Sequence, residues 1–404
     1  MMPDLAIVGG AGHVGLPLAL VFAQQGLNVH IVDRDETALA AIRDGRMPFD
    51  EEGGARLLEE ALRSSRLSQS SRMSDIAGVP VVIVTIGTPV DQFLSPDTRV
   101  IKAWADEALS WLSDDQLIIL RSTVYPGTTE WLGKYLAGLG RRPKLAFCPE
   151  RIAQRFAIRE LSELPQLVSG TTADAERRSA DLFRRIAPEV IALAPLEAEF
   201  AKLFTNSFRY ITFAIVNQFY MLATEHGADF SRILHACRHN YPRMAGMPGA
   251  GLAAGPCLLK DTMQLAAFSN NRFSLGHDAM LVNEGLPAFL VGVAKRKTNL
   301  ADKTVGILGM AFKAESDDAR DSLSYRLRKL LILEARQVLC TDPYVRDDRL
   351  VPLEQVMNEA DVVFIGAPHL VYRELQFRPE TTAIDVWEGS SAATADEPCS
   401  GGAR

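Results

Sequence analysis

Short apolar runs alternate with amphipathic stretches along the first part of the chain. The runs have the length and composition of strands, and helical stretches lie between most of them. This alternation predicts a parallel sheet that is covered by helices on both faces. The predicted strands are Leu5–Val8, Val29–Val32, Val81–Ile86, Leu117–Arg121 and Leu145–Phe147.

The hydrophobic pattern changes in the middle of the chain. Residues 196–226 contain no Gly or Pro, and large apolar side chains recur there at helical spacing. The segment therefore predicts one long helix that bridges domains and ends at Gly227. A second helical region follows the Gly- and Pro-rich segment 242–256, and the basic segment 295–303 is interpreted as a solvated connection.

A second alternation of strands and helices begins at Thr304. Its predicted strands are Thr304–Leu308, Val338–Thr341, Val362–Ile365 and Thr382–Val386. The predicted fold class is α/β, with two Rossmann-like doubly wound domains joined by a long central helix and a helical middle domain. We place the domain limits at 1–195, 196–298 and 299–390, and we expect a flexible tail at 391–404, where Ser, Ala and Gly are frequent.

Composition and charge narrow the class of protein. The chain has 404 residues, 43 basic and 50 acidic side chains, a net charge of −7 and a pI near 5.6. This balance gives no reason to expect a nucleic-acid partner or a basic membrane-binding face. The apolar fraction of 47% and the charged fraction of 23% are ordinary for a globular protein, so a disordered chain is excluded.

The cysteines and the first apolar segment bear on the compartment. Five cysteines are sparse and odd in number, which argues against a disulfide framework and for a reducing environment. No CxxC or His-rich pair suggests a metal site. Glycines, His13 and Pro17 interrupt the apolar segment 5–23, which argues against a membrane span or a signal peptide. We therefore expect a cytoplasmic protein.

A glycine-rich turn follows the first predicted strand. In Gly10-Ala11-Gly12-His13-Val14-Gly15 the glycines permit a tight turn and a close approach of a pyrophosphate to the helix N-terminus. Asp33 ends the second strand, and its carboxylate suits a ribose 2′-OH, which favours NAD over NADP. Arg34 weakens that preference, because an arginine can receive a 2′-phosphate. A purely structural glycine turn is the alternative, but strand, helix and acidic residue all lie where a dinucleotide site requires them.

A thiol, a cation and a carboxylate lie together in Cys257-Leu258-Leu259-Lys260-Asp261, after a Gly-rich loop. If Lys260 and Asp261 open a helix, Cys257 lies just before its N-terminus, where the thiol pKa falls below its usual value of about 8.5. A buried, inert cysteine is the alternative, and the segment alone leaves both open. Cys148, Cys237, Cys340 and Cys399 lack such neighbours and are interpreted as core or tail residues.

Lys202 and Asn206 lie four residues apart on the predicted long helix and so share one face. Pointing into a cleft, the two side chains could hold a developing oxyanion. Without other evidence, a snorkelling lysine and a solvated asparagine would be the preferred interpretation.

The order of these and other short segments resembles that of the nucleotide-sugar 6-dehydrogenases, the UDP-glucose/GDP-mannose dehydrogenase family. The resemblance extends to about Glu388. It rests on the glycine turn, Gly87-Thr88-Pro89, Ser122–Thr129, Pro149-Glu150-Arg151, Lys202 with Asn206, Cys257 with Lys260 and Asp261, Gly309–Lys313, Asp317–Arg320 and Asp342-Pro343-Tyr344.

The resemblance implies an NAD-dependent, four-electron oxidation of the C6 alcohol of a UDP-sugar, with a role in polysaccharide biosynthesis. Cys257 corresponds to the nucleophile that forms a thiohemiacetal and then a thioester. Lys202 and Asn206 correspond to the pair that stabilises the oxyanions, and Asp261 to a carboxylate associated with the lysine and a catalytic water. Glu150 and Thr123 correspond to residues near that water and the nicotinamide, so Glu150 is the candidate general base.

The resemblance also implies binding residues. The glycine turn with His13 and Val14, then Asp33, Arg34, Thr88, Thr123 and Arg320, would bind the cofactor. Besides Glu150, Lys202 and Asn206, the substrate would contact Arg151, Arg243, Gly251 and Lys313, with Arg243 reaching a neighbouring subunit's site or lying in a surface loop. The long helix would then form the interface of a homodimer.

The sugar stays open between two branches. Tyr125, Glu150-Arg151-Ile152 and Glu160 favour a UDP-N-acetylhexosamine, and UDP-glucose is the alternative. Ala254-Gly255-Pro256 replaces the usual Gly-Gly loop before the nucleophile, and Ala153-Gln154-Arg155 replaces a usual Pro-Gly. Two other readings compete: a β-hydroxyacid dehydrogenase, which needs no thiol, and a catalytically inactive nucleotide-sugar-binding protein.

Overall fold

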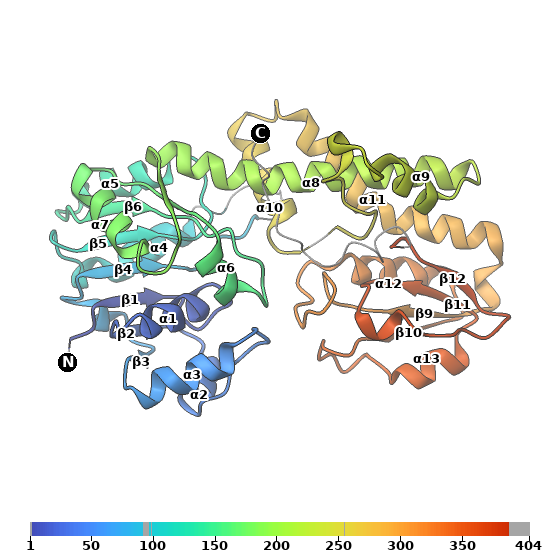
Figure 1. Cartoon of the computed structure of the whole chain (residues 1–404), viewed down its shortest axis with the longest axis horizontal. Coiled ribbons are helices and arrows are strands. Elements are labelled where there is room, and N and C mark those ends of the chain that lie inside the picture. Colours follow the sequence, from blue (N-terminus) through green and yellow to red (C-terminus); the bar gives the residue numbers. More distant parts are fainter. Residues whose placement is uncertain (1, 92–96, 98, 254, 388–404) are drawn as a thin grey trace. The chain divides into compact units, whose positions relative to one another are not determined.

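The structure, a computed structural model, describes residues 2–91, 97, 99–253 and 255–387. By their contacts these residues divide into two units, each described here by itself (Figure 1). Unit 1 contains the residues up to 205 together with 263–271, and unit 2 contains 206–262 and the residues from 272 onward. The domain limits expected from the sequence stay a prediction. Ala254, the expected flexible tail 391–404 and Cys399 lie outside the described residues.

Unit 1 is built on a six-stranded parallel sheet with the order β3-β2-β1-β4-β5-β6, which is that of a Rossmann fold. A separate parallel pair joins β7 and β8. The strands are β1 (Leu5–Val8), β2 (Val29–Val32), β3 (Leu67–Ser70), β4 (Val81–Val84), β5 (Leu117–Leu120), β6 (Lys144–Phe147), β7 (Gln166–Val168) and β8 (Val190–Ala192).

Helices cover both faces of this sheet, which explains why its central strands are apolar at every position. In β1, Leu5 and Ile7 belong to one buried cluster, whereas Ala6 and Val8 belong to another. The helices of this part of the chain are α1 (Gly15–Gln24), α2 (Glu36–Arg43), α3 (Gly54–Arg63), α4 (Arg99–Ala108), α5 (Thr128–Gly138), α6 (Ala157–Glu163) and α7 (Ala173–Phe183).

Unit 2 contains a four-stranded parallel sheet with the order β10-β9-β11-β12. Its buried clusters again lie on two faces, with α11 and α12 on one and α13 on the other. The elements are α9 (Phe230–Arg238), α11 (Ser274–Lys297), β9 (Thr304–Leu308), α12 (Leu323–Glu334), β10 (Gln337–Thr341), α13 (Leu353–Glu359), β11 (Val362–Ile365) and β12 (Thr382–Ile384). The predicted α/β class with two Rossmann-like sheets is confirmed.

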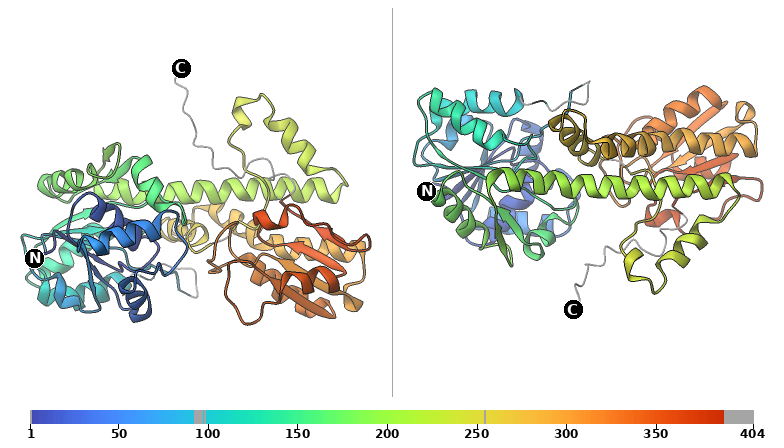
Figure 2. Two further views of the ribbon diagram at one scale, coloured as in Figure 1. Left: turned by 60° about the horizontal axis from the view of Figure 1, so that its bottom comes forward. Right: turned by 90° about the horizontal axis from the view of Figure 1, so that it is seen from above.

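Two helices contain residues of both units, α8 (Pro195–Glu225) and α10 (Leu258–Phe268). Figure 2 shows α8 as one uninterrupted helix, as predicted. It begins at Pro195, where a missing N–H costs nothing, and is followed by Gly227 at φ 68°, a backbone conformation that suits a helix end. No helix in the described part of the chain combines the length and the hydropathy that crossing a bilayer requires.

Most of the segment 295–303 is exposed and it leads into β9, as expected of a solvated connection, but its first part is helical. Helix α11 continues to Lys297, and a short 3-10 turn occupies Leu300–Asp302. The basic residues form the last helical turn because cations near a helix C-terminus interact favourably with its dipole.

Candidate active site

The glycine turn of unit 1 packs too tightly for side chains at two positions. A Cβ on Gly10 would lie 2.5 Å from Ile31 Cγ2, and one on Gly15 would lie 2.5 Å from the Gly9 carbonyl oxygen. A Cβ on Gly12 would meet only the Gly9 oxygen at 3.6 Å, so this position is open to an approaching group. Helix α1 begins at Gly15. Two tight positions around an open one fit a bound pyrophosphate.

Asp33 lies beside this turn. Its carboxylate accepts the Ala11 N–H at 2.9 Å and the Asp35 N–H at 3.0 Å. The neighbouring Arg34 guanidinium donates to Glu107. Asp33 is therefore placed at the turn as predicted, and it also holds the turn's backbone, while Arg34 has an acidic partner of its own. His13, another predicted cofactor residue, packs against Phe49 in a tilted arrangement, with ring centroids 4.1 Å apart.

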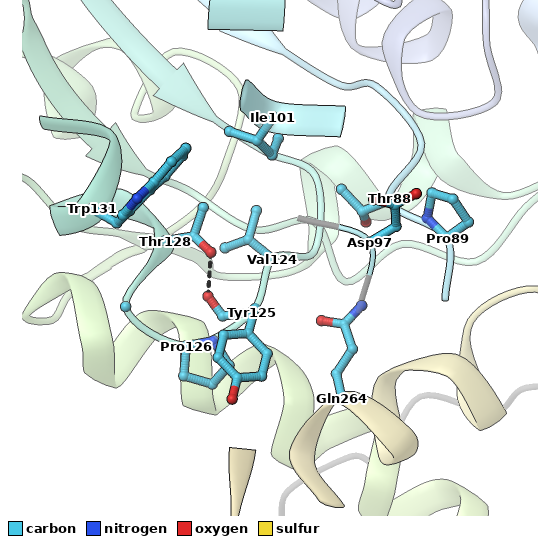
Figure 3. A pocket seen from close by; sticks show the side chains of 11 residues that line it. Thr88, Pro89, Asp97, Ile101, Val124, Tyr125, Pro126, Thr128, Trp131 and Gln264 are labelled. Carbon is cyan, nitrogen blue, oxygen red and sulfur yellow. Dashed lines mark hydrogen bonds between the residues drawn. The ribbon is translucent and has the colours of Figure 1, made fainter. Parts of the chain in front are cut away.

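Thr88 and Thr123 are brought together at the carboxyl ends of β4 and β5. The Thr88 hydroxyl donates to the Thr123 carbonyl oxygen at 2.5 Å. Close to them is a pocket of about 300 Å³ with largely apolar walls (Figure 3). Its wall includes the turn after Thr123, where the Thr128 hydroxyl donates to the Tyr125 carbonyl oxygen at 2.5 Å.

Glu150 and Lys202 form a buried ion pair. Lys202 Nζ donates to Glu150 Oε1 at 2.8 Å, and only 5% and 12% of the two side chains, respectively, are exposed. Glu150 follows β6, whereas Lys202 lies on α8. Burial alone would raise the pKa of Glu150, but Lys202 and then Arg121 outweigh it and hold the pKa below its usual value. Glu150 is therefore a carboxylate at neutral pH.

Arg121 is a residue that the sequence analysis did not single out. It directly follows β5, is fully buried and donates to the Cys148 carbonyl and the Gln166 side chain, all at 3.1 Å. Burial lowers its pKa to about 10, so it remains a cation. Arg121 could have been found in the sequence because it is a charged residue at the end of an otherwise apolar predicted strand.

Arg151 stands apart from this ion pair. Its guanidinium donates to the Pro165 carbonyl oxygen, and burial lowers its pKa. Arg155 has a left-handed backbone at φ 75° and pairs with Asp50 at 3.2 Å. Arg155 lies where the sequence analysis noted a missing Pro-Gly, so the chain keeps a glycine-like conformation without the glycine.

Unit 2 holds the cysteine and its neighbours. Cys257 is exposed and lies directly before α10, and its carbonyl accepts the Asp261 N–H at 2.9 Å. The fully buried Asp261 carboxylate accepts Asn206 Nδ2 at 2.5 Å through one oxygen and Lys260 Nζ at 2.5 Å through the other. The predicted place of Cys257 at a helix N-terminus is confirmed, and the structure brings Asn206 and Asp261 together.

Of the other cysteines, Cys148 and Cys340 are buried, as expected of core residues, whereas Cys237 is half-buried. No group of three His, Cys, Asp or Glu side chains in the described ranges is arranged to hold a metal ion.

Gly255 joins the cysteine loop to the segment after β9. It has φ 106°, and a Cβ there would lie 2.6 Å from the Phe312 ring. Arg320, eight residues after Phe312, forms a bidentate pair with Asp318, which raises the pKa of the guanidinium, with a smaller contribution from Cys257. The cysteine loop thus packs against Phe312, and the predicted cofactor residue Arg320 interacts electrostatically with Cys257.

The remaining predicted substrate residues have local partners. Gly251 exchanges two hydrogen bonds with Asn217, at 2.9 and 3.0 Å, and a Cβ there would lie 2.0 Å from the Trp387 ring. Arg243 is exposed and contacts Tyr241. Lys313 lies 6.0 Å from the Phe312 ring centroid.

Comparison with known proteins identifies the family. The UDP-glucose/GDP-mannose dehydrogenase family matches the chain with three domains: an NAD binding domain at 4–187, a central domain at 196–284 and a UDP binding domain at 306–387. A UDP-N-acetyl-D-mannosamine dehydrogenase from Pyrococcus horikoshii is 30% identical over 91% of this chain and 90% of its own. The chain belongs to the UDP-glucose/GDP-mannose dehydrogenase family.

Two solved structures share the fold. The UDP-D-ManNAc dehydrogenase structure from Pyrococcus horikoshii has a TM-score of 0.87 at 26% identity, over 95% of this chain and 99% of the other. A UDP-glucose dehydrogenase from Pyrobaculum islandicum has a TM-score of 0.88 at 26% identity, over 96% of both chains.

Membership of the UDP-glucose/GDP-mannose dehydrogenase family settles the class of the protein. It is an NAD-dependent nucleotide-sugar dehydrogenase, and NAD is its cofactor, as predicted. The family's NAD binding domain contains the glycine turn and Asp33, and its UDP binding domain contains Lys313 and Arg320. The alternatives of a β-hydroxyacid dehydrogenase and of an inactive binding protein are set aside.

Proposed function

We propose that this protein oxidises the C6 alcohol of a UDP-N-acetylhexosamine to a carboxylate through a covalent link to Cys257. The observation that carries the proposal is the exposed thiol at the N-terminus of α10, with Lys260 and the Asn206–Asp261 pair within one turn. A helix N-terminus and an ammonium both stabilise a thiolate. A thiolate adds readily to an aldehyde and leaves readily from an acyl carbon.

The bound NAD supplies the chemistry of hydride acceptance, once for each of the two oxidations. After the first oxidation the Cys257 sulfur forms a bond to the aldehyde carbon, and the resulting oxyanion takes up a proton. The second oxidation leaves a thioester on Cys257. Water then attacks the thioester, the carbon–sulfur bond breaks, and the thiolate is restored. The sum is one alcohol, one water and two NAD⁺ converted to one carboxylate, two NADH and three protons.

We assign the remaining steps to the pairs Asn206–Asp261 and Lys202–Glu150. The side-chain nitrogen of Asn206, Nδ2, carries two hydrogens, and one of them is donated to Asp261. We propose that the second is donated to the sugar oxyanion. Lys202 supplies positive charge for the same purpose. Glu150, kept ionised by Lys202 and Arg121, is our candidate to take a proton from the attacking water. Thr123 is assigned to the nicotinamide.

The choice of sugar follows the named activities of two similar proteins. A relative and a solved structure from Pyrococcus horikoshii are named for UDP-N-acetyl-D-mannosamine, which agrees with the branch favoured by Tyr125 and Glu150-Arg151-Ile152. UDP-glucose is the second candidate, because the Pyrobaculum islandicum structure named for that sugar is equally similar at 26% identity.

A substrate panel tests the proposal. NADH formation is measured with UDP-GlcNAc, UDP-GalNAc, UDP-ManNAc, UDP-glucose and GDP-mannose, and two NADH per UDP-N-acetylhexosamine consumed is the expected result. Cys257→Ser should abolish completion of the second oxidation, since a hydroxyl adds and leaves poorly, whereas Cys237→Ser is the matched control. One NADH per sugar, or full turnover in Cys257→Ser, would remove the thioester mechanism.

We also propose that the protein forms a homodimer along α8. Five large apolar side chains of this helix are between 47% and 72% exposed: Phe204, Phe208, Ile215, Phe219 and Leu222. Such a continuous apolar row suits a second copy of the same chain. Sedimentation velocity should give a dimer, and Phe208→Asp should shift it towards monomer. A monomer at micromolar concentration in the unmodified chain would contradict the proposal.

A further inference from the structure

Glu199 is a buried carboxylate on α8 that neither the sequence motifs nor the proposed chemistry uses. Only 1% of the residue is exposed. One oxygen accepts the Gly127 N–H at 2.5 Å, and the other accepts the Thr129 N–H at 2.9 Å and the Thr129 hydroxyl at 2.6 Å. Burial raises its pKa, and these three bonds oppose that rise. The carboxylate therefore has well-placed donors around both of its oxygens.

The three bonds all end at the start of α5. Gly127 is the residue before this helix, with φ 89° and no side chain of its own to cap the free N–H groups. The first N–H groups of a helix need acceptors from elsewhere. Glu199 supplies them from α8, so it ties one helix to the first turn of another.

The contacts of Glu199 with Gly127 and Thr129 are close in sequence to two residues of the proposed mechanism, Thr123 and Lys202. Thr123 lies four residues before Gly127, in the segment that connects β5 to α5, and Lys202 lies one turn after Glu199 on α8. Lys202 in turn holds Glu150 after β6. Helix α8 is thus bonded at two successive turns to the segments that follow two neighbouring strands of the unit 1 sheet. Figure 3 shows the Tyr125–Thr128 turn that belongs to this segment.

We propose that Glu199 is a positioning residue for the oxidation, which fixes the segment carrying Thr123 relative to Lys202. This rests on the proposed function, in which Thr123 contacts the nicotinamide. Glu199 touches neither substrate nor cofactor and acts through the backbone of α5. Its carboxylate form is required, because a glutamine has a single acceptor oxygen and would turn an NH₂ group towards an N–H donor.

The test compares Glu199→Gln with two other variants. Thr129→Val removes only the hydroxyl bond and keeps both backbone bonds. Glu197→Gln is the matched control, because Glu197 lies on the same helix, is exposed, and its contact with the Ala194 N–H can be kept by an amide oxygen. Steady-state kinetics are measured well below each melting temperature, with NAD and sugar varied separately. The NAD-induced rise in melting temperature is recorded in parallel and does not depend on turnover.

Glu199→Gln should lower kcat/KM for NAD by about 10-fold to 100-fold, the loss expected when reacting groups are misplaced by up to about an ångström. KM for the sugar should change less than about 2-fold, and the NAD-induced stabilisation should shrink. Thr129→Val should show a smaller loss of the same kind, and Glu197→Gln none.

If Glu199→Gln lowers the melting temperature but leaves kcat/KM for NAD and the NAD-induced shift unchanged, its role is structural only and the inference is overturned. The same holds if Thr129→Val, as a folded variant, shows no loss. Failure of the proposed function looks different, since then the unmodified chain forms no NADH with any sugar while the binding measurement still decides the role of Glu199.

Discussion

The buried pair of Lys202 and Glu150 gives a sharp quantitative prediction for Lys202→Met. The two charges are 2.8 Å apart, with 5% and 12% of their side chains exposed. The methionine fills most of the lysine's volume, so the change is chiefly one of charge. It leaves the Glu150 carboxylate in the protein interior, where Arg121 still lowers its pKa.

Removal of one partner from a buried pair costs about 3–5 kcal/mol, because the remaining charge stays desolvated. A unit of roughly this size loses about 2–4 °C of melting temperature per kcal/mol, so the expected fall is about 6–20 °C. The exposed pair of Lys102 and Asp106, at 2.7 Å with 49% and 45% exposure, is the matched control. Lys102→Met should cost less than about 1 kcal/mol.

The assay is a double-mutant cycle of Lys202→Met, Glu150→Gln and their combination, followed by thermal and urea unfolding. The double variant should lose at least about 2 kcal/mol less than the sum of the single variants, because it leaves no unpaired buried charge. Additive losses, or a Lys202→Met variant as stable as Lys102→Met, would refute the reasoning.

The pH dependence of the same variant has a definite sign. In the unmodified chain the lowered pKa of Glu150 means that its stabilisation is present above the carboxyl's ordinary pKa and is lost as pH falls through the lowered value. Without Lys202 the buried Glu150 carboxylate destabilises the folded state, and its protonation removes that destabilisation. The deficit of Lys202→Met should therefore be largest near neutral pH and shrink on acidification.

Three further variants test local features. Arg155→Gly should be about 1 kcal/mol more stable than Arg155→Ala in thermal unfolding, because the backbone at φ 75° strains any side chain. Glu51 is buried, and burial raises its pKa to about 7, so its contribution to stability is present below its ordinary pKa and is lost as pH rises through about 7. The melting temperature of Glu51→Gln relative to the unmodified chain should therefore rise between about pH 4.5 and pH 7 and then level off. Gly255→Ala should lower the melting temperature more than Gly227→Ala, since a Cβ at Gly255 would lie 2.6 Å from Phe312 and one at Gly227 would meet nothing within 4 Å. Equal values within either pair of variants, or a flat pH profile for Glu51→Gln, would contradict the corresponding argument.

The strands could be predicted where burial on both faces makes every position apolar. Leu5–Val8 and Val362–Ile365 have this form, and the structure reproduces both ranges. The missed strands lack it: Leu67–Ser70 contains three polar residues, and Gln166–Val168 and Val190–Ala192 have only three residues each. Their pairing with neighbouring strands, rather than their own side chains, makes these segments strands.

The site was predictable to the extent that its chemistry is local. The glycine turn and the cysteine before α10 are continuous segments whose conformation follows from a few neighbours. The pairs Lys202–Glu150 and Asn206–Asp261 join residues 52 and 55 positions apart, so residue spacing alone could not pair them. The family resemblance identified these residues, and the structure showed which of them bond to one another.

The two sheets also share one feature, an aspartate that accepts backbone N–H groups of a neighbouring turn. In each, an aspartate after the second strand accepts N–H groups of the turn after the first: Asp33 accepts from Ala11, and Asp342 accepts from Met310 at 2.6 Å and Ala311 at 3.0 Å.

Asp342 has more backbone donors than Asp33: one oxygen accepts the Met310 and Ala311 N–H groups, and the other accepts the Tyr344 and Val345 N–H groups. The buried His369 bonds to it as well at 3.1 Å; although burial would raise the pKa of Asp342, these bonds lower it to about 2. The Nδ1 atom of His369 accepts the Glu315 N–H, so its Nε2 atom is the donor to Asp342. Asp342 thus accepts four backbone N–H groups and an imidazole N–H, whereas the half-buried Asp33 accepts one backbone N–H on each oxygen, which leaves acceptor capacity for the ribose hydroxyl that we propose it binds. In both sheets the strand-end aspartate holds the turn after the first strand, so loss of the Asp33 carboxylate should disturb its glycine turn as well as the nucleotide contact that we propose for it.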